Sequence, residues 1–360
     1  METIGPQNLD EDDKRQTGEA ELPGLPQDSV VNTLESRNEV EPLMKRRAWF
    51  GLRGNLRRFW AVLALLTYIA GLGSGYMLWG KPAPANASNP DQADHGYRKE
   101  MEAMAAQINP KDGYEIPAVY GDIGPRLVEA GAIDLDQFVT LYQEMGRPLS
   151  KAQMAILTEG SSAPVVINQD NQHFLLNLFW AFGLANQNRV LTEGPMMGNG
   201  KEAVVNFAST GGWTIAARPI IELYASHTMV SLTEEQQKRL EEVAQGVYRP
   251  CCDNPTHFPD CNHGMAMLGL LELMASQGAS TDQMFQAAKY VNAYWFPQQT
   301  LEVAVAFKVA KNLDFDQIDS RQVVGQSVSS SSGFQAVHQW LAQNGKLEQA
   351  PQGGVSCGVK

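Results

Sequence analysis

The sequence predicts an all-α protein, with a single N-terminal transmembrane helix followed by a helical extracytoplasmic domain. Three observations support this fold class. Residues 59–79 form an uncharged, mainly apolar run. Most segments after residue 95 place apolar side chains at helical spacing, and few runs alternate as a strand does. We find no repeat of fixed period in the sequence.

The first predicted element is a disordered cytoplasmic tail at residues 1–44, which are polar and acidic with few large apolar side chains. The predicted transmembrane helix at 59–79 is close to the ~20 residues that cross a bilayer. Six basic residues lie between positions 45 and 58, whereas Lys81 is the only one between the span and Arg98. The positive-inside rule therefore predicts a cytoplasmic N-terminus and an extracytoplasmic main domain, with membrane lipid as the partner of the helix.

A cleaved signal peptide is the alternative for this region, because Ala85-Asn86-Ala87 has the small residues of a cleavage site. The apolar run is longer than the ~7–15 residues of a signal-peptide core, and the segment before it is too long for a signal sequence. An uncleaved anchor is the favoured prediction. Residues 80–95, rich in Pro, Ala and Asn, are then a linker between the membrane and the domain.

The helical ectodomain is predicted at residues 96–325. Its helices are recognised by capping residues at their starts and by apolar periodicity. Two of them, 171–185 and 263–277, are apolar nearly all round, which is typical of buried core helices. The others are expected at 98–108, 134–145, 150–157, 233–245, 281–296 and 300–311. Residues 326–360 are predicted to be a flexible tail that contains a serine-rich tract and one short helix, 334–343.

The charge balance bears on the class of partner. The formal net charge is -12, and no basic cluster appears in the predicted ectodomain. Nucleic-acid binding requires a basic surface that neutralises phosphates, so no nucleic-acid partner is predicted. The sequence does not specify a protein partner.

Residues 251–263, CCDNPTHFPDCNH, are the chemically densest stretch of the chain. They contain three of its four cysteines and two of its six histidines. Thiolate and imidazole are the ligands of thiophilic ions such as Zn or Cu, and four of them complete a tetrahedron. We therefore predict a metal site formed by Cys251, Cys252, Cys261 and His263. In this interpretation, Cys261 and His263 lie at a helix N-terminus, which favours thiolate.

His257, within the stretch, and Cys357, in the tail, are reserve ligands in this prediction. The leading functional hypothesis is thus a membrane-anchored extracytoplasmic protein that binds Zn or Cu through a Cys/His loop.

Two other functions remain open for the same residues. The cysteines can act as a thiol–disulfide redox centre, or they can form structural disulfides in an interaction scaffold, since four is an even number and the predicted compartment is oxidising. Motifs of serine hydrolases, zinc proteases and EF-hands are not found in the sequence. Whether the protein is an enzyme is left open, because catalytic residues need not be close in sequence.

Overall fold

The computed structural model describes residues 90–347, with side chains from residue 99 onward. Residues 101–347 belong to one compact unit. The predicted cytoplasmic tail, the predicted span at 59–79 and Cys357 lie outside the described residues. The anchor and the extracytoplasmic location therefore stay predictions.

The described chain is mostly helical, but two segments pair as an antiparallel sheet, β1 (Tyr114–Gly121) and β2 (Ser161–Ile167). In addition, none of the helices within residues 90–347 combines the length and apolarity needed to cross a bilayer. The predicted fold class, all-α with a transmembrane helix, is therefore wrong for the part of the chain that the structure describes. That part is a helical domain with a small sheet.

The sheet is irregular, which explains why its strands are hard to recognise in the sequence. Tyr114 pairs with Ile167 and Ile116 with Val165, and the register then shifts twice before Gly121. Pro117 stands at the first shift, where a residue without an N–H is tolerated in a strand. Burial nevertheless alternates along β1 as a half-buried strand requires.

The helices of the first half are α2 (Pro90–Ile108), α3 (Ile123–Glu129), α4 (Leu135–Glu144), α5 (Lys151–Thr158) and α6 (Gln172–Ala185). Short elements follow, α7 (Arg189–Thr192), η1 (Pro195–Asn199), η2 (Lys201–Asn206), α8 (Ala208–Gly211) and α9 (Ile220–Leu223). The second half contains α10 (Glu234–Gly246), α11 (Asn262–Ser276), α12 (Thr281–Trp295), α13 (Pro297–Lys311), η3 (Phe315–Gln317), α14 (Ser320–Val324), α15 (Gln326–Ser329) and α16 (Ser331–Gln343).

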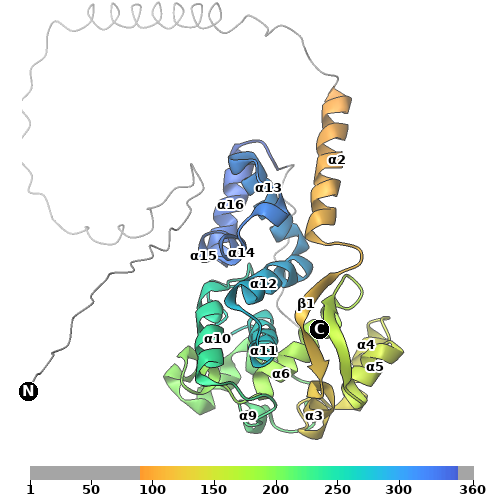
Figure 1. The fold of residues 1–360 in the computed structure, drawn as a ribbon, viewed down its shortest axis with the longest axis vertical. Helices are drawn as coiled ribbons and strands as arrows, with labels where there is room; N and C mark the ends of the chain where they lie inside the picture. Colours follow the sequence, from red (N-terminus) through yellow and green to blue (C-terminus); the bar gives the residue numbers. More distant parts are fainter. Residues whose placement is uncertain (1–89, 348–360) are drawn as a thin grey trace, which may run out of the picture. The chain divides into compact units, whose positions relative to one another are not determined.

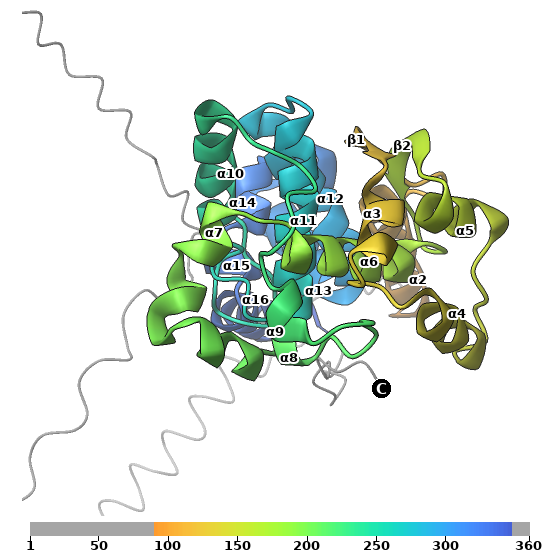
Figure 2. The ribbon, with the colours of Figure 1, turned by 90° about the horizontal axis from the view of Figure 1, so that it is seen from below.

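Helices α6 and α11 form the centre of the larger hydrophobic core, with the sheet, α3, α4 and α5 on one side and α10 on the other (Figures 1 and 2). A smaller core lies among α13, α16 and the end of α2, where Ile108, Phe307 and Leu341 are buried. The C-terminal segment that the sequence places in a tail contributes α15 and α16, and Ser330 caps α16 by accepting from Gly333 N at 3.0 Å.

The contact between α6 and α11 depends on two glycines. A Cβ on Gly183 would lie 2.3 Å from the carbonyl oxygen of Met265, and a Cβ on Gly269 would lie 2.4 Å from that of Phe179. Further along, Asn186 donates to Glu272 at 2.8 Å. Because Gly183 faces Gly269 and Asn186 faces Glu272 with the same spacing along both helices, α6 and α11 run in the same direction. Their close approach fixes where α11 begins, and the cysteine-rich loop ends there.

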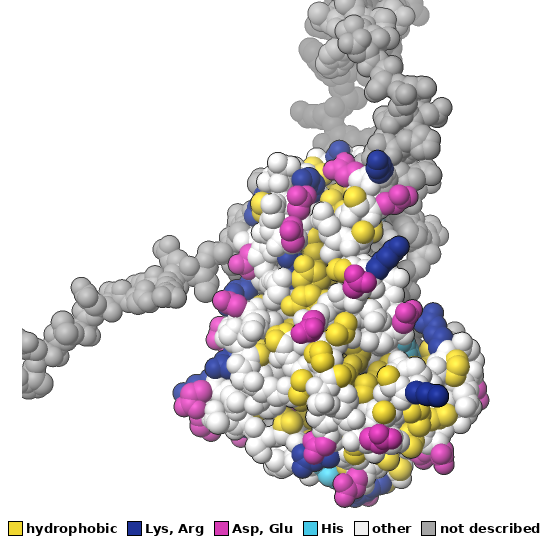
Figure 3. Space-filling model, turned by 45° about the vertical axis from the view of Figure 1, so that its right-hand side comes forward, with side chains coloured by type: hydrophobic (Ala, Val, Ile, Leu, Met, Phe, Trp, Pro, Cys, Tyr) yellow, Lys and Arg dark blue, Asp and Glu magenta, His cyan; other side chains and the backbone are white. Residues whose placement is uncertain are grey.

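One face of the domain surface is drawn in Figure 3. Acidic and basic side chains are interspersed over it, with hydrophobic side chains forming a band between them. The charge on this face is therefore mixed rather than of a single sign.

Candidate metal centre

The cysteine-rich loop connects α10 to α11 and folds back on itself. Thr256 donates from its backbone N to the carbonyl of Val247 at 2.8 Å, and from its hydroxyl to the same oxygen at 3.0 Å. The backbone N of His257 donates to Ala244 O at 2.9 Å, at the end of α10. These bonds close the loop, so that its last cysteine returns to the two at its beginning. At the other side, Ser331 N donates to Cys252 O at 3.0 Å, which ties the loop to the start of α16.

The three thiols of the loop lie together. The Sγ atom of Cys261 is 3.4 Å from that of Cys251 and 3.8 Å from that of Cys252, and all three lie within 4.8 Å of one another. No disulfide joins the cysteines among the described residues. Cys251 and Cys252 are partly exposed, whereas Cys261 is buried.

Cys261 is also the N-cap of α11. Its Sγ atom accepts from the backbone N of Gly264 at 3.4 Å, in the place where a serine or aspartate oxygen usually caps a helix. The positive end of the α11 dipole therefore acts directly on this sulfur, as expected from the sequence.

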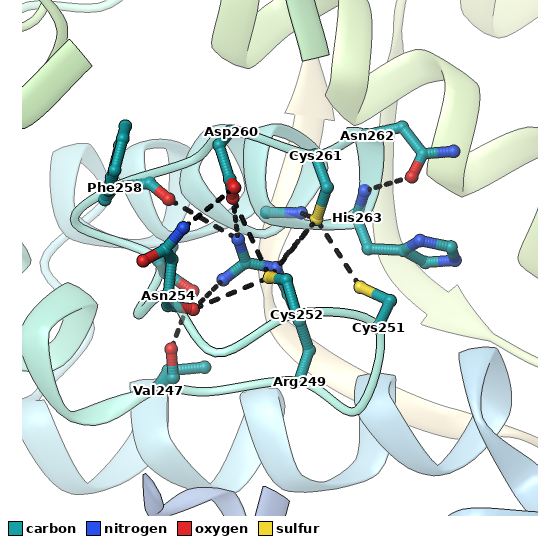
Figure 4. Close-up of polar contacts among 12 residues, drawn as sticks. Val247, Arg249, Cys251, Cys252, Asn254, Phe258, Asp260, Cys261, Asn262 and His263 are labelled. Atoms are coloured by element: carbon teal, nitrogen blue, oxygen red, sulfur yellow. Dashed lines mark hydrogen bonds and ion pairs between the residues drawn. The ribbon is translucent and has the colours of Figure 1, made fainter. Parts of the chain in front are cut away.

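A buried arginine completes the cluster. The side chain of Arg249 is 1% exposed, and its Nε donates to Cys261 Sγ at 3.1 Å. Its other nitrogens donate to Asn254 O at 3.0 Å, to Phe258 O at 3.5 Å and to Asp260 Oδ1 at 3.3 Å. Figure 4 shows the guanidinium between Asp260 and the sulfur atoms. Arg249 thus binds several groups along the loop and also the Sγ atom of Cys261, which both other thiols contact.

The sulfur atoms differ in acidity. Hydrogen bonds from Cys251 and Cys252 hold the pKa of Cys261 well below its usual value, against burial, and the positive charge of Arg249 lowers it further. The hydrogen bond with Cys251 lowers the pKa of Cys252, but the bond with Cys261 and burial outweigh it and raise that pKa to about 12. Within the metal-free cluster, Cys261 is therefore the more acidic thiol and Cys252 the less acidic one.

His263, the fourth predicted ligand, does not join the sulfur group. Its imidazole points away from the three sulfur atoms (Figure 4) and packs on Phe296, with ring centroids 4.6 Å apart. Burial lowers the pKa of His263 to about 4, so the ring is neutral, and its Nδ1 is buried without a hydrogen-bond partner. A neutral imidazole with an open nitrogen has the protonation state of a ligand, but the structure does not place that nitrogen among the sulfurs.

The structure brings together three of the four predicted ligands and adds one residue that the sequence analysis missed. His257 is likewise outside the sulfur group, and the methionines of α11 are buried in the main core. The signal for Arg249 was available, because a basic residue stands two positions before Cys251. Its burial, however, follows only from the folding of the loop around it.

Sulfur separations test whether the cluster fits a metal ion. A tetrahedral zinc ion with Zn–S bonds of about 2.3 Å holds its sulfur ligands about 3.8 Å apart. The two sulfur separations given above, 3.4 and 3.8 Å, lie close to this spacing and well beyond the ~2.05 Å of a disulfide bond. Two of the three sulfur separations therefore suit a tetrahedral thiophilic ion, and the third, between Cys251 and Cys252, lies within 4.8 Å. Comparisons with protein-family models, with curated proteins and with solved structures find no match to this chain.

Proposed function

We propose that this domain binds a thiophilic metal ion, Zn(II) or Cu(I), through Cys251, Cys252 and Cys261. The observation that carries the proposal is the convergence of the three sulfur atoms within 4.8 Å at the start of a buried helix. Soft thiolates suit both ions, and Zn(II) and Cu(I) are the metals that such ligands most often hold. Three protein ligands leave one corner of a tetrahedron for another donor.

The identity of the fourth donor decides the kind of site. A fourth protein ligand makes a closed site for storage or structure, whereas a position without a protein ligand leaves the site open. His263 supplies it if its ring rotates toward the sulfurs, which its unpartnered Nδ1 favours, because binding would give that nitrogen a partner. An open corner would instead take water or a ligand from another molecule, which suits a protein that hands its ion on.

Metal analysis of the full-length protein tests the proposal. The reduced protein is loaded with Zn(II) or Cu(I), freed of excess metal and analysed for bound ion per chain. We expect a single tightly held ion in the wild type and its loss in Cys261→Ser, because Cys261 contacts both other thiols. Cys357→Ser is analysed alongside, because Cys357 lies outside the loop in the sequence and is a predicted reserve ligand. Unchanged metal content in this variant would show that the tail thiol is not the fourth donor. A reduced wild-type protein that retains no metal would refute the proposal.

The same titration applied to His263→Ala assigns the fourth corner. A loss of affinity without loss of stoichiometry is expected if the imidazole is a ligand, whereas unchanged binding assigns the corner to another donor. Either result leaves the three-thiol site in place.

A thiol–disulfide redox centre is a second candidate, favoured by the 3.4 Å separation of the Cys251 and Cys261 sulfur atoms. In this reaction two thiols form one disulfide, while their two electrons and two protons reduce the disulfide of a partner protein to two thiols. Intact mass after equilibration with a thiol–disulfide buffer distinguishes the two functions. A reversible loss of two hydrogens in the metal-free protein, together with no metal binding, would favour the redox function.

A further inference from the structure

Arg249 is held in place by contacts that a surface arginine does not have. Its guanidinium is almost completely buried, and it donates to a sulfur, to two backbone carbonyls and to the carboxylate of Asp260. A buried charge is unfavourable unless other charges and hydrogen bonds compensate it. In this loop the compensation comes from the ion pair with Asp260 and from four hydrogen bonds, one of them to Cys261 Sγ. The buried guanidinium is therefore a structural part of the sulfur cluster.

The charge of the metal complex gives Arg249 a role beyond folding. Three thiolates around a divalent ion leave one net negative charge, and the guanidinium offsets it at 3.1 Å from Cys261 Sγ. Asp260 adds a negative charge, but its side chain is 23% exposed and also accepts from Asn254 Nδ2 at 2.8 Å, so water and an amide screen it. Without Arg249, a negatively charged complex would remain in a largely buried place.

The N–H···S hydrogen bond also affects the sulfur as a ligand. It stabilises the lone pairs of the Cys261 thiolate, so more energy is needed to transfer an electron from that sulfur to a bound metal ion. Groups that hold and orient metal ligands in this way typically change metal affinity about 10–100-fold when they are mutated.

Gly264 offers an independent way to displace the arginine. A Cβ at this position would lie 2.2 Å from Nη2, 2.5 Å from Cζ and 2.8 Å from Nε of Arg249. The backbone N–H of residue 264, which donates to Cys261 Sγ, would be retained in an alanine variant. Alanine is also the better helix former, so Gly264→Ala moves the guanidinium without removing a thiol or a charge.

We propose that Arg249 is a positioning residue of the metal site, which orients Cys261 as a ligand and neutralises the three-thiolate complex of a divalent ion. This inference rests on the proposed metal-binding function. The hydrogen bonds of the guanidinium carry it: one goes to Cys261 Sγ, and three go to other groups of the cysteine-rich loop.

Cobalt(II), a spectroscopic substitute for Zn(II), tests the inference in the reduced full-length protein. Affinities for Co(II) and Zn(II) are measured by competition with a chelator, and the sulfur-to-cobalt charge-transfer band is recorded for wild type, Arg249→Gln, Arg249→Lys and Gly264→Ala. Arg218→Gln is the matched control, because Arg218 pairs with Glu222 on the exposed surface at 3.1 Å.

We expect Arg249→Gln and Gly264→Ala to bind both ions about 10–100-fold more weakly, with the charge-transfer band moved to longer wavelength. Arg249→Lys retains the charge but not the planar fork, so affinity should recover in part while the band stays displaced. The band is the readout that a purely structural role would not move. If Arg249→Gln does not fold, the affinity and the band position of Gly264→Ala test the positioning role on their own.

Wild-type affinity and an unmoved band in Gly264→Ala and Arg249→Gln would overturn the positioning role and leave the metal site intact. A wild-type protein that binds neither ion would instead refute the proposed function, and this inference with it. The two failures are thus distinguished by the wild-type titration alone.

Discussion

The crossing of α6 and α11 sets the position of the cysteine-rich loop, and Gly269→Ala tests how tightly it is packed. A Cβ at residue 269 would lie 2.4 Å from Phe179 O and 2.7 Å from Gly183 N, and both are backbone atoms that cannot rotate away. Ordinary contacts begin near 3.4 Å, so the helices must separate by about 1 Å.

The expected cost follows from two opposing effects. Overpacking a core costs about 1–3 kcal/mol, and a clash with backbone belongs at the upper end of that range. Replacing a helical glycine by alanine returns about 1 kcal/mol of helix propensity. The free energy of unfolding should therefore fall by about 2 kcal/mol.

Urea unfolding of the full-length protein, followed by far-ultraviolet circular dichroism, measures this change. Gly198→Ala is the matched control, because a Cβ at that exposed glycine meets nothing within 4 Å. The control should leave stability nearly unchanged. A Gly269→Ala protein as stable as the wild type, or a control that loses as much, would show that the crossing is not the tight contact described above.

Three further substitutions test buried polar groups and a helix cap. Burial raises the pKa of Glu272 well above its usual 4.5, against the bond from Asn186, so its ionised form is disfavoured in the folded protein. Unfolding free energy should fall by up to about 1.4 kcal/mol per pH unit above 4.5, and Glu272→Gln should lack this slope in urea titrations across pH. Burial lowers the pKa of Lys289 from 10.5 to about 8, so wild-type stability should rise as pH increases between those values. Thermal unfolding of Lys289→Met in the same window should show no such rise, and a parallel rise would contradict the assignment. Ser280→Ala removes the capping box of α12 and should cost about 1 kcal/mol, seen as a lower urea midpoint at constant slope.

Local signals in the sequence predicted the longer helices of the described residues, whereas short ones such as α3 and α14 were not predicted. The capping box predicted from Thr233 and Gln236 is present, and of the two caps that the sequence allows for the helix after Gly278, Ser280 and Thr281, the structure uses Ser280. The two apolar segments became the core helices α6 and α11, because a helix that is apolar all round must be covered on every side. These features depend on residues within one or two turns of each other, so no knowledge of the fold is needed.

The sheet escaped prediction because its pairing joins residues distant in sequence. Tyr114 and Ile167 pair across more than one intervening helix, and Pro117 interrupts the alternation that marks a strand. Hydrogen bonds between strands are decided by the partner that the fold brings near, and no pattern in one strand contains that information.

For the candidate site, the sequence by itself determined which atoms are available: three thiols, an imidazole and an arginine within fifteen positions of one another. Only the tertiary structure decided which of them meet. The loop closes against α10 and brings the sulfurs together, while the position of α12 draws the His263 ring onto Phe296 and away from them. The reason is physical, because metal-ligand geometry depends on side-chain directions, and those are set by packing between elements that sequence spacing does not describe.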